Sequence, residues 1–523
     1  MNIKEWIFTT DHKRVGILYL IGSITAFAVA GVMALLMRAE LSTIGPTITS
    51  NPSNYNVWLY AHGAVMILGF QIPALTGFFA NYCIPLMIGA KDVAFPRVNA
   101  LSVWLFYVGI ILAVLTFFIP DPPDVMWTGY PPYSTISTGN TALYTFTVLI
   151  LGFASIIGGV NFLTTVAYMR APGLKWGKLN IFVWCTLGAF VLQLIFVPVL
   201  GTAVTLISFD KYLGTHFFDP AAGGDVLTYQ NLFWFYSHPA VYVIFLPFIG
   251  VIYEIVTTFA KNPPFNYKMV VYGGIFGIVG LSGEVWVHHL YTSGMADWIR
   301  IGMMVTTLMI SVPVGLMVIG LAGTLYKGSI TFETPMLYAL GVMFLFLIGG
   351  LTGIPLAVTS LTVHLSRSYY VVGHFHYVMA VAGTFAIFAG VYYWFPKMTG
   401  RMYNERWGKI GFWITFIGTN IVFWTMMDIG VKGMPRRYYD YSHMSQFEGA
   451  HQLMTIGAII LGIGFVIALI NWIVGAIKGP KAGENPWGSK SLEWTTVSPP
   501  PHGNWPSPPV LEEGWSPYAY RRA

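Results

Sequence analysis

The chain has 523 residues, of which 55% are hydrophobic and only 9% are charged, and its formal net charge is +6. Soluble domains carry about 25% charged residues, so this composition excludes a soluble globular protein. We expect an all-α polytopic membrane protein surrounded by a lipid bilayer, with no nucleic-acid partner.

Twelve apolar runs can each cross a hydrocarbon core about 30 Å thick. Helices are expected, because a lipid-exposed backbone must satisfy its own hydrogen bonds and the runs lack the short alternation of barrel strands. An even number of spans places both termini on one side, and Lys and Arg after even-numbered spans indicate that this side is cytoplasmic. The predicted spans lie near 15–37, 57–86, 100–119, 143–168, 179–208, 230–260, 269–290, 299–325, 336–360, 369–395, 409–430 and 451–476.

The two ends of the chain are polar in different ways. The start, MNIKEWIFTTDHKRVG, has no small-residue cleavage site after a short apolar core, so we do not expect a cleaved signal peptide. Residues 479–523 are rich in Pro, Trp and Gly, which is typical of an extended tail rather than a domain. The expected organisation is a twelve-helix catalytic domain over 1–478, followed by this tail.

Six histidines stand in segments that are otherwise almost wholly hydrophobic. A polar side chain at such a place is expensive, so these imidazoles are expected to bind something, and metal is the first candidate. In chain order they are His62 in the second span, His238 in the sixth, His288 and His289 at the end of the seventh, and His374 and His376 in the tenth.

The tenth-span pair is expected to serve two centres. His374 and His376 are two positions apart, which on a helix is about 200° of rotation, so they point to opposite sides. One of them pairs with His62 as the second axial ligand of a six-coordinate haem, and the other holds a five-coordinate haem with an open position. Cys83 and Cys185 lie in apolar helices, so any thiolate-ligated electron-entry metal must sit on another chain.

The other three imidazoles predict a second metal beside the open haem. His238, His288 and His289 together suit copper, while iron and zinc remain open on ligand type alone. Tyr242 follows His238 by four residues and therefore shares its helix face.

These motifs resemble subunit I of the haem–copper oxygen reductases, the catalytic subunit of cytochrome c oxidase. The resemblance covers nearly the whole chain and is carried by HPAVY, WVHHLYTSGM, YYVVGHFHYVM and GMPRRY. It implies two haems of a, b or o type and one CuB-type copper, with iron possible in its place. By this resemblance the low-spin haem is held by His62 and His376, the high-spin haem by His374, the copper by His238, His288 and His289, the haem surroundings by Arg38, Arg436 and Arg437, and Tyr242 matches a tyrosine bonded covalently to a copper histidine.

The resemblance also implies a proton path. Tyr236 and Ser237 resemble the branch of the family in which a tyrosine hydroxyl replaces the usual proton-delivering glutamate, whose own position is Ala240. The uptake channel from the cytoplasm is matched by Asp92, Asn81 and Asn99.

Several departures from the family pattern bear on the substrate. Val314 and Met317 stand where a threonine and a lysine form a second proton path. Ser366 and Arg367 stand where a histidine and an aspartate bind a non-redox metal, so that metal site is expected to be absent. Glu284 precedes His288 by four residues and is expected one turn away, as a buried metal ligand or proton carrier, with a structural pairing as the alternative.

The numbers of electrons and protons consumed distinguish two candidate enzymes, an oxygen reductase and a nitric oxide reductase. Oxygen reduction takes four electrons and four protons, whereas joining two nitric oxide molecules to nitrous oxide takes two of each, so a site with one proton path removed favours nitric oxide. Tyr242 favours the alternative, a proton-pumping cytochrome c oxidase. A transporter or channel is disfavoured, because it does not require axial-ligand pairs.

The resemblance also implies partners and a location. We expect a subunit II that carries CuA and/or cytochrome c, further small membrane subunits, cytochrome c as donor, and the prokaryotic inner membrane.

Overall fold

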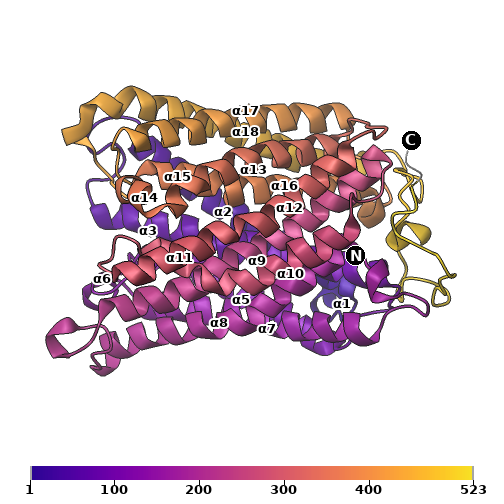
Figure 1. Cartoon of the computed structure of the whole chain (residues 1–523), viewed down its shortest axis with the longest axis horizontal. Coiled ribbons are helices and arrows are strands. Elements are labelled where there is room, and N and C mark those ends of the chain that lie inside the picture. The colour runs from indigo at the N-terminus through magenta and orange to yellow at the C-terminus, as the bar shows by residue number, and fades with distance from the viewer. Residues whose placement is uncertain (1–2, 521–523) are drawn as a thin grey trace.

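The structure is a computed structural model that describes residues 3–520. Within this range the chain forms a bundle of long helices that run roughly along one axis (Figure 1). Eleven helical segments are long and apolar enough to cross a membrane. They are α2 (His12–Glu40), the run from α3 (Pro52–Ala64) to α4 (Ala80–Ile88), α5 (Pro96–Leu115), α7 (Thr141–Tyr168), α8 (Ile181–Leu213), α9 (Val226–Ala260), α11 with α12 (Asp297–Met309 and Ser311–Leu325), α13 (Thr334–Ala357), the run from α15 to α16 (Tyr369–Thr399), α17 (Glu405–Val431), and α18 (Glu448–Lys478) with the turn before it.

The seventh predicted span is shorter than expected. A π-helix (η5, Met269–Ile275), α10 (Phe276–Leu281) and a 3-10 turn (η6, Ser282–Glu284) replace one long helix, and a second 3-10 turn (η7, Trp286–Leu290) follows. Glycine recurs every few residues from 273 to 283, and each one weakens a helix by about 1 kcal/mol relative to alanine. Twelve long helices were predicted. Among the described residues the structure has eleven long apolar segments and one short apolar helix in the place of the seventh span.

The segments that carry the histidines of interest form the centre of the bundle. In the most apolar 18-residue stretch of each segment, the share of buried residues is 94% in α9, 83% in the α15–α16 run and 78% in the α3–α4 run. In α18 it is only 28%. Buried spans such as these are enclosed by other helices, so they can present polar side chains to one another rather than to lipid.

Two of these central segments contain π-helical turns. The α3–α4 run includes η1 (Val65–Gln71) and η2 (Pro73–Phe79), while α15 (Tyr369–Phe375) passes into η8 (His376–Val381) before α16 (Ala382–Thr399). Gln71 donates to the carbonyl of Ala380 at 2.6 Å, which ties one π-helical segment to the other. Such turns are frequent at functional sites because they displace side chains from the regular helical register.

The remaining helices are short connectors at the two ends of the bundle. They are α1 (Ile3–Ile7), α6 (Tyr133–Ile136), η3 (Trp176–Lys178), η4 (Pro220–Ala222), α14 (Thr359–Leu365), η9 (Ser442–Phe447) and η10 (Leu492–Thr495).

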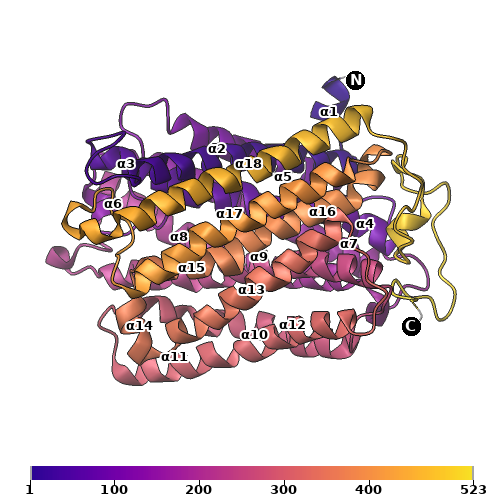
Figure 2. The same cartoon turned by 90° about the horizontal axis from the view of Figure 1, so that it is seen from above.

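Both described termini lie at the same end of the bundle, as an even number of crossings requires (Figure 2). The chain after α18 has only one short 3-10 turn, η10, but it is packed against this end and not simply extended into solvent. Glu493 and Asn504 are fully buried in this packing. The prediction of an extended polar tail therefore missed its contacts with the bundle.

Candidate functional site

A cavity of about 1600 Å³ lies inside the bundle. All six of the histidines singled out above line it, together with Arg38, Arg436 and Arg437. Its walls come from α2, α3, α9, α13, α15 and α17, among others, and are mostly apolar. The cavity is larger than the 300–1000 Å³ of an ordinary ligand pocket and has room for more than one large group.

His62 and His376 face each other across one part of this cavity. Their rings are parallel to within 7° and their centroids are 6.3 Å apart. Each Nδ1 donates to a carbonyl, that of His62 to Ala30 at 3.0 Å and that of His376 to Val372 at 2.8 Å, so each Nε2 is left for a ligand. Two imidazoles that bind one metal ion from opposite sides through bonds of about 2 Å have centroids roughly 6 Å apart.

His374 points away from that pair, as its two-residue offset from His376 predicts. Its Nδ1 donates to the carbonyl of Gly349 at 3.0 Å and lies 3.2 Å from Thr352 Oγ1, both on α13. The Nε2 atom is therefore available on the opposite side of the helix from His62. A carbonyl partner of this kind fixes the orientation of a metal-binding imidazole.

His238, His288 and His289 gather into one cluster. One ring nitrogen from each lies within 4.8 Å of the other two, which is the spacing of a metal site. The His289 ring stacks on Trp234 with centroids 3.7 Å apart, so its orientation is set by α9. Nε2 of His238 is buried and has no hydrogen-bond partner. A buried polar nitrogen left unpaired in this way is costly, and three neutral imidazoles fit copper as a donor set.

Tyr242 lies beside this cluster. Its ring centroid is 4.7 Å from that of His238, and both side chains are buried on α9. This confirms the shared helix face that the four-residue spacing predicts.

The arginines expected at the haems line the cavity, and so do Tyr236 and Ser237, which were expected in the proton path. Arg38 is buried, and its guanidinium donates to Nδ1 of His451 at 3.2 Å. Tyr236 and Ser237 are buried on α9 and face the same space. His451 is a neighbour that the sequence analysis missed, and no local pattern marks it.

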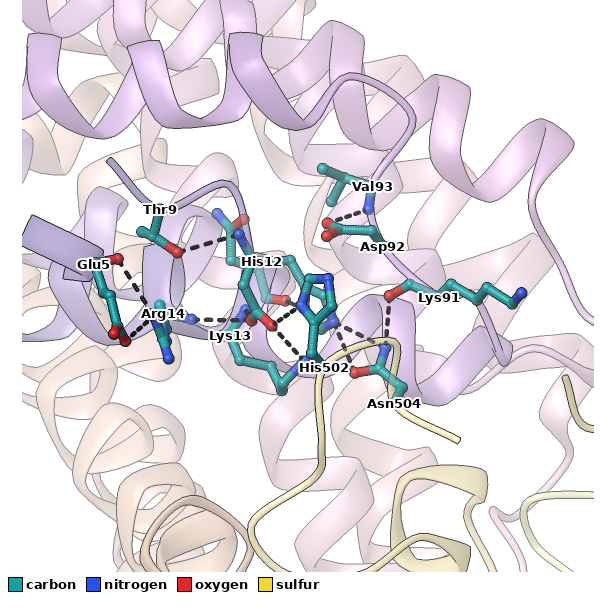
Figure 3. Close-up of polar contacts among 12 residues, drawn as sticks. Glu5, Thr9, His12, Lys13, Arg14, Lys91, Asp92, Val93, His502 and Asn504 are labelled. Carbon is teal, nitrogen blue, oxygen red and sulfur yellow. Dashed lines mark hydrogen bonds and ion pairs between the residues drawn. The ribbon is translucent and has the colours of Figure 1, made fainter. Parts of the chain in front are cut away.

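The predicted proton-entry residues lie near the end of the bundle where both termini are found. Nδ2 of Asn99 donates to Oδ1 of Asn81 at 2.6 Å, and both side chains are buried. The carbonyl of Asn81 accepts a hydrogen bond of 2.6 Å from Nδ1 of His12. Asp92 lies in the loop just beyond, where its carboxylate accepts from the backbone N–H of Val93 (Figure 3).

The C-terminal tail closes this region from outside. Asn504 accepts a hydrogen bond of 2.8 Å from Nζ of Lys13 and donates one of 2.8 Å to the carbonyl of Ala90. Its amide also contacts Nε2 of His12 (Figure 3). The tail thus belongs to the structure around Asp92, which the sequence analysis did not anticipate.

A small cavity of about 30 Å³ continues inward from Asn81. It is large enough for a water molecule, and its polar lining includes Tyr19, Ser102 and Ser155. The hydroxyl of Tyr19 donates to Ser102 at 2.9 Å. These hydroxyls extend the line of polar groups beyond the residues that the sequence analysis named.

The expectation that Glu284 is buried one helical turn from His288 is wrong. Val285, with φ −123° and ψ 5°, separates the two 3-10 turns η6 and η7, so Glu284 and His288 do not share an α-helical face. The Glu284 side chain is exposed in this chain rather than buried beside the histidine cluster. The rule that residues four apart are neighbours applies only within a regular helix.

Glu284→Gln is therefore expected to leave turnover within about twofold of the unmodified enzyme, the size of an ordinary surface substitution. Steady-state gas consumption by the purified complex measures this effect. A heavy loss of turnover with intact haem spectra would show that Glu284 takes part in catalysis after all.

Comparisons with known proteins agree with this geometry. Residues 14–460 match the family model described as cytochrome c and quinol oxidase polypeptide I. The chain is 43% identical over 516 residues to cytochrome c oxidase subunit 1 of Thermostichus vulcanus, covering 98% of this chain and 92% of that protein. It is 44% identical over 505 residues to the subunit of the same name from Synechocystis sp., covering 96% and 91%.

The chain belongs to the haem–copper oxidase subunit I family. Members carry two haems and CuB, and the chain is accordingly an oxidoreductase with these cofactors. A solved structure, reported as a heme-copper terminal oxidase dimer, has the same fold, with a TM-score of 0.78 at 19% identity over 90% of this chain and 85% of that one.

The relatives favour the oxidase alternative over the nitric oxide reductase that the sequence analysis preferred. Both relatives are named as cytochrome c oxidase subunits. Glu284, one of the departures from the family pattern that bore on the substrate, is exposed and not buried at the site.

Proposed function

We propose that this chain is the oxygen-reducing subunit I of a cytochrome c oxidase. The observation that carries the proposal is the position of Tyr242, whose ring lies 4.7 Å from that of His238 within the three-histidine cluster. Breaking the O–O bond requires an electron and a proton beyond those that metals readily supply, and a phenol at this place provides both. Joining two nitric oxide molecules has no such requirement.

The six histidines divide between the cofactors. His62 and His376 would hold the low-spin haem and His374 the high-spin haem, while His238, His288 and His289 would hold the copper. When bound, these groups supply electron transfer and the binding and reduction of the gas. Arg38, Arg436 and Arg437 would orient the haems, since guanidinium groups bind carboxylates through paired hydrogen bonds.

Protons would enter from the end of the bundle that carries the termini. Asp92 takes up a proton on its carboxylate at the surface loop, and the amides of Asn81 and Asn99 orient the water that carries it inward. Tyr236 and Ser237 would form the far end of this route, since both line the wall of the large cavity.

Asp92→Asn is expected to lower turnover by about 10²-fold, the lower range for losing a positioned proton-transfer group. The same change is expected to stabilise the fold. Burial raises the pKa of Asp92 from 3.8 to about 6, although the Val93 N–H opposes this shift. The carboxyl therefore binds its proton more tightly when folded, and its contribution to stability is lost as the pH rises through about 6.

At pH 7.5 Asp92→Asn should raise the free energy of unfolding by about 1–3 kcal/mol, because the penalty for burying the charge disappears. Thermal unfolding and oxygen uptake of the same preparation measure both effects. Asp121→Asn, in an exposed loop, is the matched control. Equal turnover in the Asp92→Asn and Asp121→Asn variants would show that Asp92 is not part of the proton path.

The substrate is tested by following oxygen and nitric oxide consumption under one electron donor. Fast, cyanide-sensitive oxygen uptake with slow nitric oxide turnover is expected. Rapid nitric oxide loss with nitrous oxide formed and little oxygen uptake would overturn the proposal.

Nitric oxide reduction is the second candidate because of one feature of α12. Met317 is fully buried where the family has a lysine, and Val314 occupies the place of a threonine. Neither side chain conducts protons, so the second path is missing. A reaction that consumes fewer protons tolerates this loss better.

The setting of the chain follows from the family. It is a multi-pass membrane protein that works with a subunit II. We further propose that subunit II carries CuA and/or cytochrome c, that small membrane subunits complete the complex, that cytochrome c is the donor, and that the complex lies in a prokaryotic inner membrane and pumps protons. Residues 1–478 would form its catalytic domain.

A further inference from the structure

Three arginines gather at the end of the bundle opposite the C-terminal tail. Arg367 follows α14, while Arg436 and Arg437 follow α17. The backbones of the two segments are paired, because Arg436 N–H donates to the carbonyl of Arg367 at 2.9 Å and Tyr369 N–H donates to that of Met434 at 2.9 Å. The three arginines therefore lie on two short backbone segments that are hydrogen-bonded to each other.

All three arginines line the large cavity. Among the residues that the structure describes, none forms an ion pair or a side-chain hydrogen bond with any of these guanidinium groups. Arg367 and Arg437 have φ values of +64° and +72°, a left-handed conformation that is uncommon for arginine. Strain of this kind persists where the surroundings fix the backbone, and it is concentrated at ligand sites.

The positive charges of the three groups act on one another. Burial lowers the pKa of Arg436 to about 10, and the fields of Arg437 and Arg367 add to this effect. The same three arginines favour the ionised form of Tyr130, although burial raises the pKa of that phenol overall. Arg436 and Arg437 are largely shielded from solvent and have no carboxylate partner among the described residues, so an anion bound in the cavity would offset their charge, and the more exposed Arg367 adds a third positive charge beside them.

The family's non-redox metal does not fit here. A guanidinium offers only donors, so Arg367 cannot ligate a cation. Ser366 alone is a poor substitute for a histidine and an aspartate, since Mg²⁺ and Mn²⁺ favour carboxylate oxygens. The same place in the fold thus carries a fixed positive charge on the protein itself.

We propose that Arg367 replaces that metal ion as a source of positive charge and, with Arg436 and Arg437, binds the propionate carboxylates of the haems. This inference rests on the haem-anchoring role proposed for Arg436 and Arg437. Two haems bring four carboxylates, and each guanidinium can bind one through two parallel hydrogen bonds. A permanent charge at this position needs no metal supply and cannot dissociate.

The proposal is tested on the intact complex by potentiometric titration of the haem absorbance at fixed ionic strength. A nearby cation disfavours the oxidised, more positive haem. Arg367→Gln should therefore shift at least one haem's equilibrium about threefold or more towards the oxidised form, while Arg367→Lys stays close to the unmodified enzyme. Because Arg367 is exposed in this chain, both variants are expected to fold.

Metal content provides a readout independent of turnover. After growth with Mn²⁺, the purified unmodified complex should show no stoichiometric bound Mn²⁺ by electron paramagnetic resonance. One bound Mn²⁺ per complex would overturn the proposal. Unchanged haem potentials in Arg367→Gln would also overturn it, and loss of a partner subunit in that case would assign Arg367 to an acidic partner surface instead.

Arg437→Gln separates this inference from the proposed function. A lowered haem potential in Arg437→Gln alone overturns the role of Arg367 and leaves the anchor assignment standing. Unchanged haem potentials in both variants would reject the role of Arg367 and also the haem-anchor assignment of Arg437.

Discussion

Replacing His289 with alanine is expected to remove copper from the complex and abolish turnover. The three ring nitrogens of His238, His288 and His289 lie within 4.8 Å of one another, so each is one third of the donor set. Loss of an outer partner of a metal ligand already costs 10- to 100-fold in affinity or activity. Loss of a ligand itself should therefore lower turnover by more than about 100-fold.

The measurement is copper per haem by elemental analysis, with the visible spectrum of the same sample. Both haem bands should remain, because His289 belongs to a different cluster from the haem-facing histidines. His443→Ala, at an exposed histidine, is the matched control and should retain copper. Full copper content in His289→Ala would exclude this imidazole as a ligand.

His376→Leu is expected to remove the low-spin haem, so that haem per chain falls from two to one. His62 and His376 present parallel rings with centroids 6.3 Å apart, and each Nδ1 is already bonded to a carbonyl. A six-coordinate iron needs both free nitrogens. Leucine fills a similar volume on the helix but offers no ligand, so the fold should be kept.

Quantitative haem extraction and the reduced-minus-oxidised spectrum measure this loss. His364→Leu, at an exposed position on α14, controls for the general effect of replacing a histidine by leucine. Retention of two haems and an unchanged low-spin band in His376→Leu would show that His62 pairs with another residue.

The parts of the site that lie on regular helices were predictable from the sequence. His238 and Tyr242 are four residues apart on α9, and their rings do lie together. His374 and His376 point to opposite sides even though the helix changes from α to π between them. In these cases the local period alone sets the direction of the side chain.

The prediction failed where the helix was not regular. The glycine-rich segment before His288 breaks into 3-10 turns, so the four-residue spacing of Glu284 and His288 carries no information about their contact. The contacts of the tail were also out of reach. Asn504 and His12 are 492 positions apart, and only the folded bundle brings them together.

The position of Asn504 also has a consequence for biogenesis. This residue is synthesised after every spanning helix, yet its hydrogen bonds to Lys13 and Ala90 fix the loop that carries Asp92. A nascent chain that contains all of the spanning helices still lacks these hydrogen bonds until residue 504 has been synthesised. In the proposed proton route, completion of the entrance around Asp92 would therefore depend on synthesis and folding of the C-terminal segment.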